Sequence, residues 1–230
     1  MIRDRVLRHV EDELASGRLR VGDRLPGERA LGTQLGISRA SVREGIRVLE
    51  AMGVIRTAVG SGPDAGAVVV ADTAAGITSA LRLHLASNTL PVVDVVRTRL
   101  LLEGWAVREA SRRRDDPTLD AAQALLDEMD GADAVDEFLR LDGEFHVTLS
   151  RAAGNTVVAA IMTSLRGAIH GYVLAAAPHD WAPTARRLRR QHRNVLAAVR
   201  AGDGDRAAQL VERHIEGFYR ARSTRSAGST

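Results

Sequence analysis

The stretch LPGERALGTQLGISRASVREGIRVLEAMGVI, residues 25–55, decides the fold of the N-terminal third of this chain. It predicts a short helix over about 28–34 that stops at Gly36, because glycine tolerates the left-handed backbone that ends many helices. Ser38 is a favoured N-cap residue, so a second helix begins after it and runs to about Met52. Two helices joined by so short a turn are typical of a helix-turn-helix.

The flanking residues complete this unit. A preceding helix is predicted by the apolar spacing of Val6, Leu7, Val10 and Leu14. After residue 53, two strands are expected at 54–58 and 67–70, around a glycine-rich tip. Three helices followed by a β-hairpin form a winged helix-turn-helix, which we assign to residues 1–71.

Beyond residue 71 the pattern becomes almost continuously helical. Apolar stripes with helical spacing recur through about 73–87, 92–113, 118–129, 133–152, 156–176, 183–201 and 204–222. Short connections between them predict an antiparallel all-α bundle of six or seven helices over residues 77–222, after a hinge at 72–76. Residues 223–230 are expected to form a disordered tail. The fold class is therefore mostly α, with one small β-hairpin.

The composition is that of a globular protein, with 45% hydrophobic and 27% charged residues in a chain of 230. No apolar run approaches the roughly 18–20 residues of a membrane span, and the charged N-terminus is unlike a signal peptide. We therefore expect a cytoplasmic protein with no membrane partner. The chain contains no cysteine, so any metal must be held by nitrogen and oxygen ligands. All 32 basic residues are arginine, the side chain best suited to phosphate and guanine.

Three arginines line one face of the second helix of the helix-turn-helix. Arg39, Arg43 and Arg47 follow one another at steps of four, beside the apolar face that packs inward. Such a helix lies in the major groove, where Arg39 and Arg43 are placed to read guanine and Arg47 to contact phosphate. A solvated basic face paired with Glu44 and Glu50 is the alternative that spacing alone leaves open.

Four polar side chains occupy positions where a helical bundle normally places aliphatic residues. Asp142 and His146 lie one turn apart on an apolar stripe, and His192 and His214 interrupt the stripes of two later helices. Burying each one alone would cost several kcal/mol, roughly 2–7 by transfer estimates. Together they form a three-histidine, one-carboxylate ligand set for a divalent cation. A hydrogen-bonded Asp–His network is the alternative that would also satisfy them.

Arg99 is a fifth polar residue on an apolar stripe. Beside a metal ion, a buried guanidinium favours a small carboxylate effector, which can bind both the ion and the arginine. An ion pair with Glu103, one helical turn away, explains the same pattern equally well.

Three segments of the N-terminal unit carry a family resemblance. They read LPGERAL at 25–31, LGISRASVRE at 35–44 and LEAMGVI at 49–55, and together they resemble the winged-helix domain of GntR-family transcription regulators. The resemblance implies that the principal DNA contacts are Arg29, Arg39 and Arg43. It also makes Ser41 a supporting contact and Gly60 a wing residue near the minor groove. The chain departs from the family pattern in having glycine at 27 and 32, and in a wing lengthened by residues 63–66.

The helical region carries a second resemblance. Its matching positions are Arg99 and Glu103, Asp142 and His146, Gly154 and Asn155, His192, and His214. These resemble the FCD domain, the all-helical ligand-binding domain of the FadR branch of the same family. The resemblance implies that the aspartate and the three histidines hold a divalent ion near an effector pocket, with zinc first and nickel or manganese as alternatives. Asn155 and Tyr172 are further candidates for effector contacts.

These features predict a DNA-binding transcription regulator, a repressor by resemblance, that acts as a homodimer on a palindromic double-stranded operator. A small organic acid bound near the metal is expected to control operator affinity. The alternative is a metal-dependent hydrolase, or another helical metalloenzyme, fused to a DNA-binding module. No H-E-x-x-H, phosphate-loop or nucleophile motif supports it, so we predict that the chain is not an enzyme.

Overall fold

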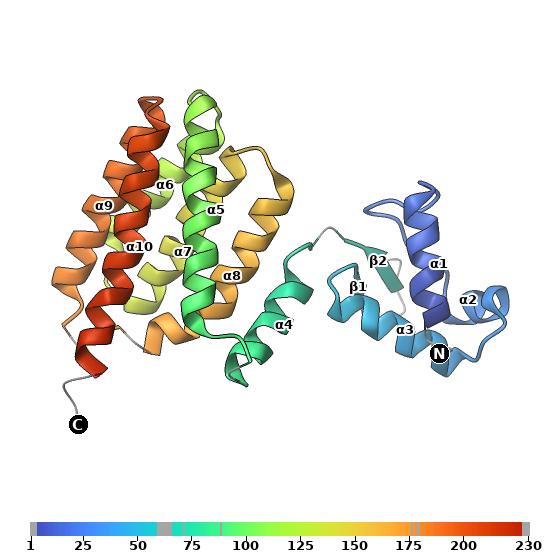
Figure 1. Ribbon diagram of the computed structural model, residues 1–230. Helices are drawn as coiled ribbons and strands as arrows, with labels where there is room; N and C mark the ends of the chain where they lie inside the picture. Colours follow the sequence, from blue (N-terminus) through green and yellow to red (C-terminus); the bar gives the residue numbers. More distant parts are fainter. Residues whose placement is uncertain are drawn as a thin grey trace. The chain divides into compact units, whose positions relative to one another are not determined.

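The computed structural model of the chain describes residues 4–58, 66–70, 72–87, 89–175, 177–178 and 180–226. The chain separates into two compact units, residues 1–77 and 78–230. Each unit has its own hydrophobic core. Figure 1 labels the helices and strands of both.

The N-terminal unit is a winged helix-turn-helix, as predicted. Its described elements are α1 (Asp4–Ala15), α2 (Glu28–Leu35), α3 (Arg39–Ala51), β1 (Ile55–Ala58) and β2 (Gly66–Val69). The two strands pair antiparallel, from Ile55 opposite Val69 to Ala58 opposite Gly66. Both helix signals are confirmed. Gly36 ends α2 in the left-handed region with φ 62°, and the Ser38 side chain accepts a hydrogen bond from the Ser41 amide.

A close approach of α1 to α3 sets the packing of this unit. Val6 and Val10 of α1 are buried in the same core as Val42 and Leu49 of α3. Gly45 lies in the middle of α3, where an added Cβ would stand 2.6 Å from the Cβ of Val6. A glycine is required at this crossing because a larger side chain would force the two helices apart.

The C-terminal unit is built from helices, and the predicted bundle is confirmed. The described helices from residue 75 onward are α4 (Ala75–Ala86), α5 (Val92–Arg112), α6 (Thr118–Gly131), α7 (Val135–Ala152), α8 (Thr156–Ala175), α9 (Ala182–Arg200) and α10 (Gly204–Ser226). Helix α4 begins inside the predicted hinge, where the Asp72 side chain accepts a hydrogen bond from the Ala75 amide. Helix α10 runs through Ser226, so residues 223–226 of the predicted tail are helical, and 227–230 lie outside the described residues.

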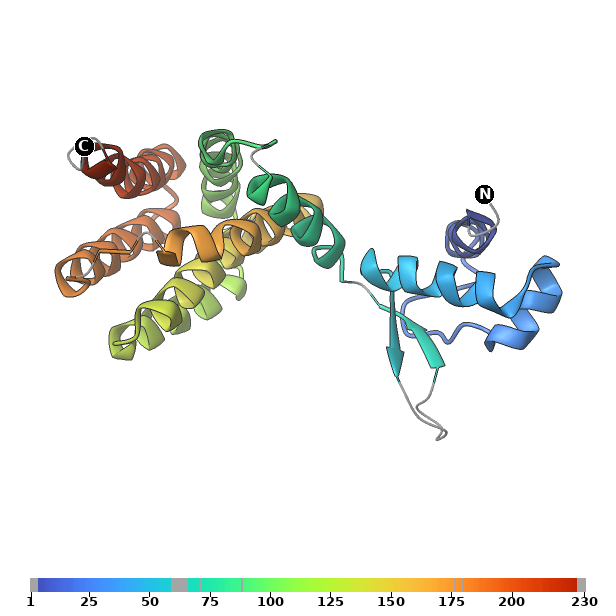
Figure 2. The same cartoon turned by 90° about the horizontal axis from the view of Figure 1, so that it is seen from below.

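Helix α7 is central to the bundle, because it packs against α5, α6 and α8. Helix α10 lies between α5 and α9 (Figures 1 and 2). The core between these helices contains the buried rings of Phe138 and Phe145, together with Leu126, Met162 and Leu188. The polar residues singled out in the sequence therefore lie in a predominantly apolar interior.

Helix α8 is long and apolar enough to cross a membrane by length and composition alone, with a mean hydropathy of 1.4. This differs from the expectation that no stretch of the chain meets that standard. About two fifths of its most apolar window, 39%, is buried within the protein. The helix packs against α5 and α7, and its Arg166 forms an ion pair with Asp142 of α7. These contacts are those of a core helix in a bundle. Such helices are often as long and as apolar as a membrane-spanning helix.

Candidate metal centre

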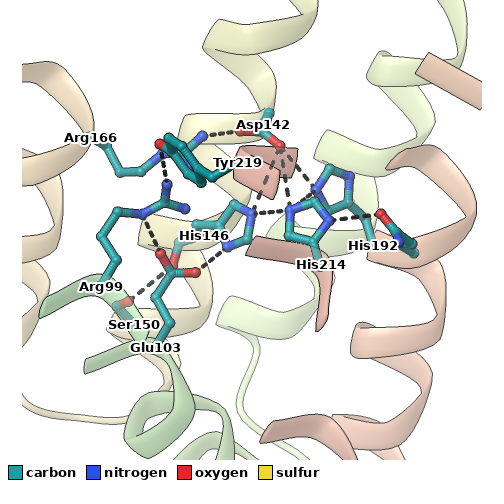
Figure 3. A network of polar contacts seen from close by, with 10 residues as sticks. Arg99, Glu103, Asp142, His146, Ser150, Arg166, His192, His214 and Tyr219 are labelled. Atoms are coloured by element: carbon teal, nitrogen blue, oxygen red, sulfur yellow. Dashed lines mark hydrogen bonds and ion pairs between the residues drawn. The ribbon is translucent and has the colours of Figure 1, made fainter. Parts of the chain in front are cut away.

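The four predicted ligand residues meet at one place in the bundle. Asp142 and His146 come from α7, His192 from α9 and His214 from α10 (Figure 3). Their exposed fractions are 6%, 2%, 0% and 4%, and one ligand atom from each lies within 4.8 Å of the others. Helical periodicity turns each residue inward, and the packing of three helices brings them together. We call this group of four the cage.

The cage has the dimensions of a metal site. Oδ1 of Asp142 lies 3.0, 3.8 and 4.0 Å from Nε2 of His192, His146 and His214. Nε2 of His214 lies 3.2 Å from Nε2 of both other histidines. A tetrahedral zinc ion with bonds of about 2.0–2.1 Å separates its ligand atoms by about 3.3 Å. A divalent ion therefore fits among these four atoms with small adjustments.

The outer ring nitrogens decide which tautomer each histidine adopts. Nδ1 of His146 lies 2.5 Å from a carboxylate oxygen of Glu103, and Nδ1 of His214 lies 3.2 Å from Oε1 of Gln191. Both oxygens are acceptors, so these contacts favour a proton on Nδ1 of each ring, although Nδ1 of His146 makes no hydrogen bond of acceptable geometry within the part of the chain that the structure describes. The two Nε2 atoms then present lone pairs to each other across 3.2 Å. A metal ion bound to both atoms would satisfy this arrangement, and metal-bound histidines are commonly held by an acceptor at the other ring nitrogen.

The electrostatics of the cage suit a metal. Burial lowers the pKa of His146 and that of His214, and the neighbouring imidazoles lower the pKa of His214 further. Both rings are thus held in the neutral form that binds metal. Burial by itself would raise the pKa of Asp142, but Arg166 and His192 hold it well below its usual range. The cage is therefore three imidazoles and an ionised carboxylate. Nδ1 of His192 has no hydrogen-bond partner among the described residues.

Arg99 adopts the ion pair that the sequence left as one of two explanations. Its Nε donates to Glu103 at 2.8 Å, and the side chains of both residues are at most 3% exposed. Nη1 also donates to the Tyr219 hydroxyl at 3.2 Å. Burial would raise the pKa of Glu103, but Arg99 and His146 hold it well below its ordinary value. Glu103 therefore links Arg99 to the cage through His146 (Figure 3).

A chamber of about 20 Å³ lies beside the cage, bordered by Arg99, Asp142, Arg166, His214 and Tyr219 together with apolar side chains. Arg99 borders this chamber, and its contact with an effector stays a prediction. Asn155 and Tyr172 do not border this chamber. Asn155 caps α8, its side chain accepting from the Val157 and Val158 amides at 3.0 and 3.1 Å. Tyr172 is 44% exposed.

Sequence reasoning missed three residues that the structure places next to the cage: Glu103 as the partner of His146, Gln191 as the partner of His214, and Arg166 as the partner of Asp142. For Arg166 a signal existed. It is a charged residue within the apolar helix α8, the same kind of interruption that identified the cage residues. The contacts of Glu103 with His146 and of Gln191 with His214 could not be predicted in this way, because each joins residues of two different helices whose packing the sequence does not show.

The predicted DNA-reading residues lie at the surface of the N-terminal unit. Arg39, Arg43 and Arg47 are exposed on α3, and Arg29 is exposed on α2. The Ser41 hydroxyl lies 2.9 Å from that of Ser38, at the first turn of α3. Gly60 lies outside the described residues.

The carboxylate that pairs with these arginines is not one of those expected. Glu28 of α2 accepts two hydrogen bonds from Arg43, at 3.1 and 2.9 Å, and lies 3.8 Å from Arg39. Glu50 instead accepts hydrogen bonds from the amide and the hydroxyl of Thr57 in β1. The arginine face of α3 is thus oriented from α2, and Arg47 has no ion-pair partner among the described residues.

A winged helix-turn-helix with an exposed arginine face, joined to a bundle with a buried ligand cage, defines a DNA-binding regulator with a sensor domain. The chain belongs to the gntR family of bacterial regulatory proteins. The family model matches residues 2–63, and that of the FCD domain matches residues 94–217.

Known proteins similar to this chain are regulators as well. The "Glc operon transcriptional activator" of Escherichia coli K12 is 30% identical over 213 residues, covering 84% of this chain and 78% of that protein. The "HTH-type transcriptional repressor NanR" of Edwardsiella tarda is 27% identical over 240 residues, covering 100% and 90%. The chain is therefore a DNA-binding transcription regulator and not an enzyme, which excludes the hydrolase alternative.

Solved structures agree on the fold. "Streptococcus agalactiae GntR" superposes with a TM-score of 0.67 at 21% identity, covering 96% of this chain and 100% of that one. "E. coli McbR/YncC" gives a TM-score of 0.53 at 16% identity, covering 98% and 99%.

Proposed function

We propose that this regulator is a metal-dependent sensor of small organic acids. Its helical domain holds a divalent ion in the cage, zinc in the first place, with nickel and manganese as alternatives. The observation that carries the proposal is the convergence of four buried ligand atoms, one each from Asp142, His146, His192 and His214, within 4.8 Å of one another. Burial lowers the pKa of His146 and that of His214, which disfavours a proton between these two rings and favours a metal ion.

The charge at the cage favours an anionic effector. Three neutral imidazoles and one carboxylate leave a divalent ion with a net charge of about +1 and with coordination positions for water or ligand oxygens. Arg99 and Arg166 border the adjoining chamber, and Tyr219 adds a hydroxyl. A carboxylate suits this place because it can bind the ion and accept hydrogen bonds from a guanidinium. Its binding would change operator affinity by a coupling free energy of about 1–3 kcal/mol.

The N-terminal unit reads the operator in this proposal. Arg39 and Arg43 contact base edges in the major groove, Arg29 is a third principal contact, and Ser41 and Arg47 support them. The chain acts as a homodimer on a palindromic site, in the cytoplasm, and represses transcription. A relative named as a repressor, aligned over 100% of this chain, supports repression, whereas the relative named for the Glc operon is an activator. Transcription from an operator-bearing template, with and without the protein, measures the sign directly.

Metal analysis of the full-length protein tests the cage. Protein loaded in turn with Zn²⁺, Ni²⁺ or Mn²⁺ and then desalted should retain about one ion per chain for at least one metal. His192→Ala should lose that ion, whereas His84→Ala, which removes an exposed histidine of α4, should keep it. If the wild-type protein retains no ion under any of these conditions, the ligand assignment is wrong.

A thermal-shift screen of small organic acids tests the effector class. Binding raises the melting temperature by mass action, and an acid that ligates the ion should do so only in metal-loaded protein. A stabilising acid should then change the affinity for operator DNA. Stabilisation of the same size in the metal-free protein would place the effector elsewhere.

A further inference from the structure

The chamber next to the cage is too small for an organic acid. Its volume of about 20 Å³ holds one water molecule, which needs about 10–15 Å³ of such space. A carboxylate with even a short carbon chain needs several times more. An effector that reaches the metal must therefore occupy a neighbouring cavity, and a side chain between the two must move.

A second cavity, of about 500 Å³, lies between α7 and α8 on the other side of the chamber wall. Its lining is mixed, with apolar Leu125, Val147 and Ile169 alongside polar Thr148, Thr163 and Arg151. Among the described residues, Leu139, Arg166 and Val173 border both cavities. Of these three, Arg166 has the longest side chain and the only charge, so it is the one that an incoming carboxylate can draw to itself.

Arg166 lies close to the backbone of α7 at Gly143. Gly143 lies in the middle of α7 and borders the larger cavity. An added Cβ on Gly143 would stand 3.6 Å from Nε and Nη2 of Arg166, in van der Waals contact. The Arg166 guanidinium therefore lies against the backbone of α7 at Gly143, between the chamber and the larger cavity.

The inner end of Arg166 is held by the cage. It donates to Oδ2 of Asp142, while Oδ1 of the same carboxylate faces the three histidines. The Arg166 side chain is 12% exposed and so lies at the boundary between the interior and the larger cavity. A metal ion bound to Asp142 shares the charge of that carboxylate, which weakens the hold on Arg166. An incoming carboxylate can then replace Asp142 as its partner.

We propose that Arg166 is a gate between the cage and the α7–α8 cavity, and that the effector reaches the metal by this route. The carboxylate of the acid pairs with Arg166 at the cage, and the body of the acid occupies the larger cavity. This inference rests on the proposed metal and effector function. It adds the route, the gating residue and a size class: an organic acid too large for the chamber alone.

The route is tested with zinc itself, by transfer from the loaded full-length protein to excess 4-(2-pyridylazo)resorcinol in a stopped-flow spectrometer. Arg166→Ala should release zinc about tenfold faster, which corresponds to about 1.4 kcal/mol of barrier. Thr163→Phe fills the larger cavity from α8 and should slow release. Val147→Phe fills it from α7 and serves as a second variant if the first does not fold. Arg97→Ala removes an exposed arginine of α5 that borders neither cavity, and it should release zinc at the wild-type rate.

The double variant Arg166→Ala/Thr163→Phe distinguishes two explanations for faster release. In one, Arg166 closes the route through the larger cavity; in the other, it only holds Asp142 in place. If Arg166 is a gate, filling the cavity returns release toward the wild-type rate. Release that stays as fast as in Arg166→Ala alone overturns the gate while leaving the metal site intact. A wild-type protein that takes up no zinc overturns the proposed metal function, and this inference with it.

Discussion

At the scale of single residues, two side chains of the cage have two polar ends, and each end has a different partner. His146 turns Nε2 inward and Nδ1 toward Glu103, and Asp142 turns Oδ1 inward and Oδ2 toward Arg166. The outer contact fixes the orientation and the protonation of the inner atom. Residues that never touch the metal are therefore expected to set its affinity.

Glu103→Gln tests this directly. An amide can donate to Nδ1 of His146, which would move the ring proton to Nε2 and block that ligand. We expect metal affinity to fall by about 10–100-fold, as for other partners of metal-bound histidines. Competition with a chelator of known affinity measures the loss. Glu109→Gln, which changes a partly buried carboxylate of the same helix that pairs with Arg112, is the matched control, and equal affinity in both variants would show that Glu103 does not act through His146.

Arg43 is the proposed base contact whose removal should have the clearest effect on operator affinity. In the structure its guanidinium donates two hydrogen bonds to Glu28, and the proposed contact with a guanine edge would take over those donors. Arg43→Ala should reduce operator affinity by about 1–3 kcal/mol and leave metal content unchanged. Fluorescence anisotropy with a labelled operator gives the affinity. Arg112→Ala, an exposed arginine of the C-terminal unit, should bind DNA like the wild type; a similar loss there would point to general charge instead of base contact.

At the scale of elements, the contact between α1 and α3 positions the arginine face. Gly45→Ala would place a methyl carbon 2.6 Å from the Cβ of Val6, and overpacking of this kind costs about 1–3 kcal/mol. We expect the N-terminal unit to lose that much stability in urea unfolding. Val6→Ala in the same chain should recover part of the loss by removing the clash.

Gly131→Ala is the control for this substitution. Gly131 ends α6 with open space around its Cβ position, so alanine there should be neutral or slightly stabilising. Equal effects of the two substitutions would mean that helix propensity, and not the crossing of α1 and α3, governs Gly45.

At the scale of the whole molecule, the chain has two separate cores, and the proposed metal site lies in one of them. Because the cage joins α7, α9 and α10, a bound ion stabilises the C-terminal unit by about 4 kcal/mol when free metal is a thousandfold above its Kd. Stripping the metal with a chelator should therefore lower one of two calorimetric transitions and leave the other in place. His192→Ala should abolish the response to chelator. A shift of both transitions, or of neither, would contradict the proposal that the ion stabilises the C-terminal unit by joining α7, α9 and α10.

Much of this molecule could be predicted from local pattern. Helix periods, the Ser38 cap and the Gly36 stop identify the helix-turn-helix, because each depends on neighbours within a few residues. The cage residues were found for the same reason: a charged or imidazole side chain on an apolar stripe must turn inward whatever lies opposite it. Asn155 and Tyr172 were chosen without such a constraint, and the structure does not bring them to the chamber.

The sequence by itself determined the two-part fold, the arginine face of α3 and the inward direction of Asp142, His146, His192 and His214. Only the tertiary structure decided which side chains pair: Glu28 and not Glu44 or Glu50 with Arg43, Glu103 with both Arg99 and His146, and Arg166 with Asp142. The physical reason is one of range. Periodicity sets the face of a helix on which a residue lies, whereas a partner on another helix depends on how the two helices cross and rotate against each other.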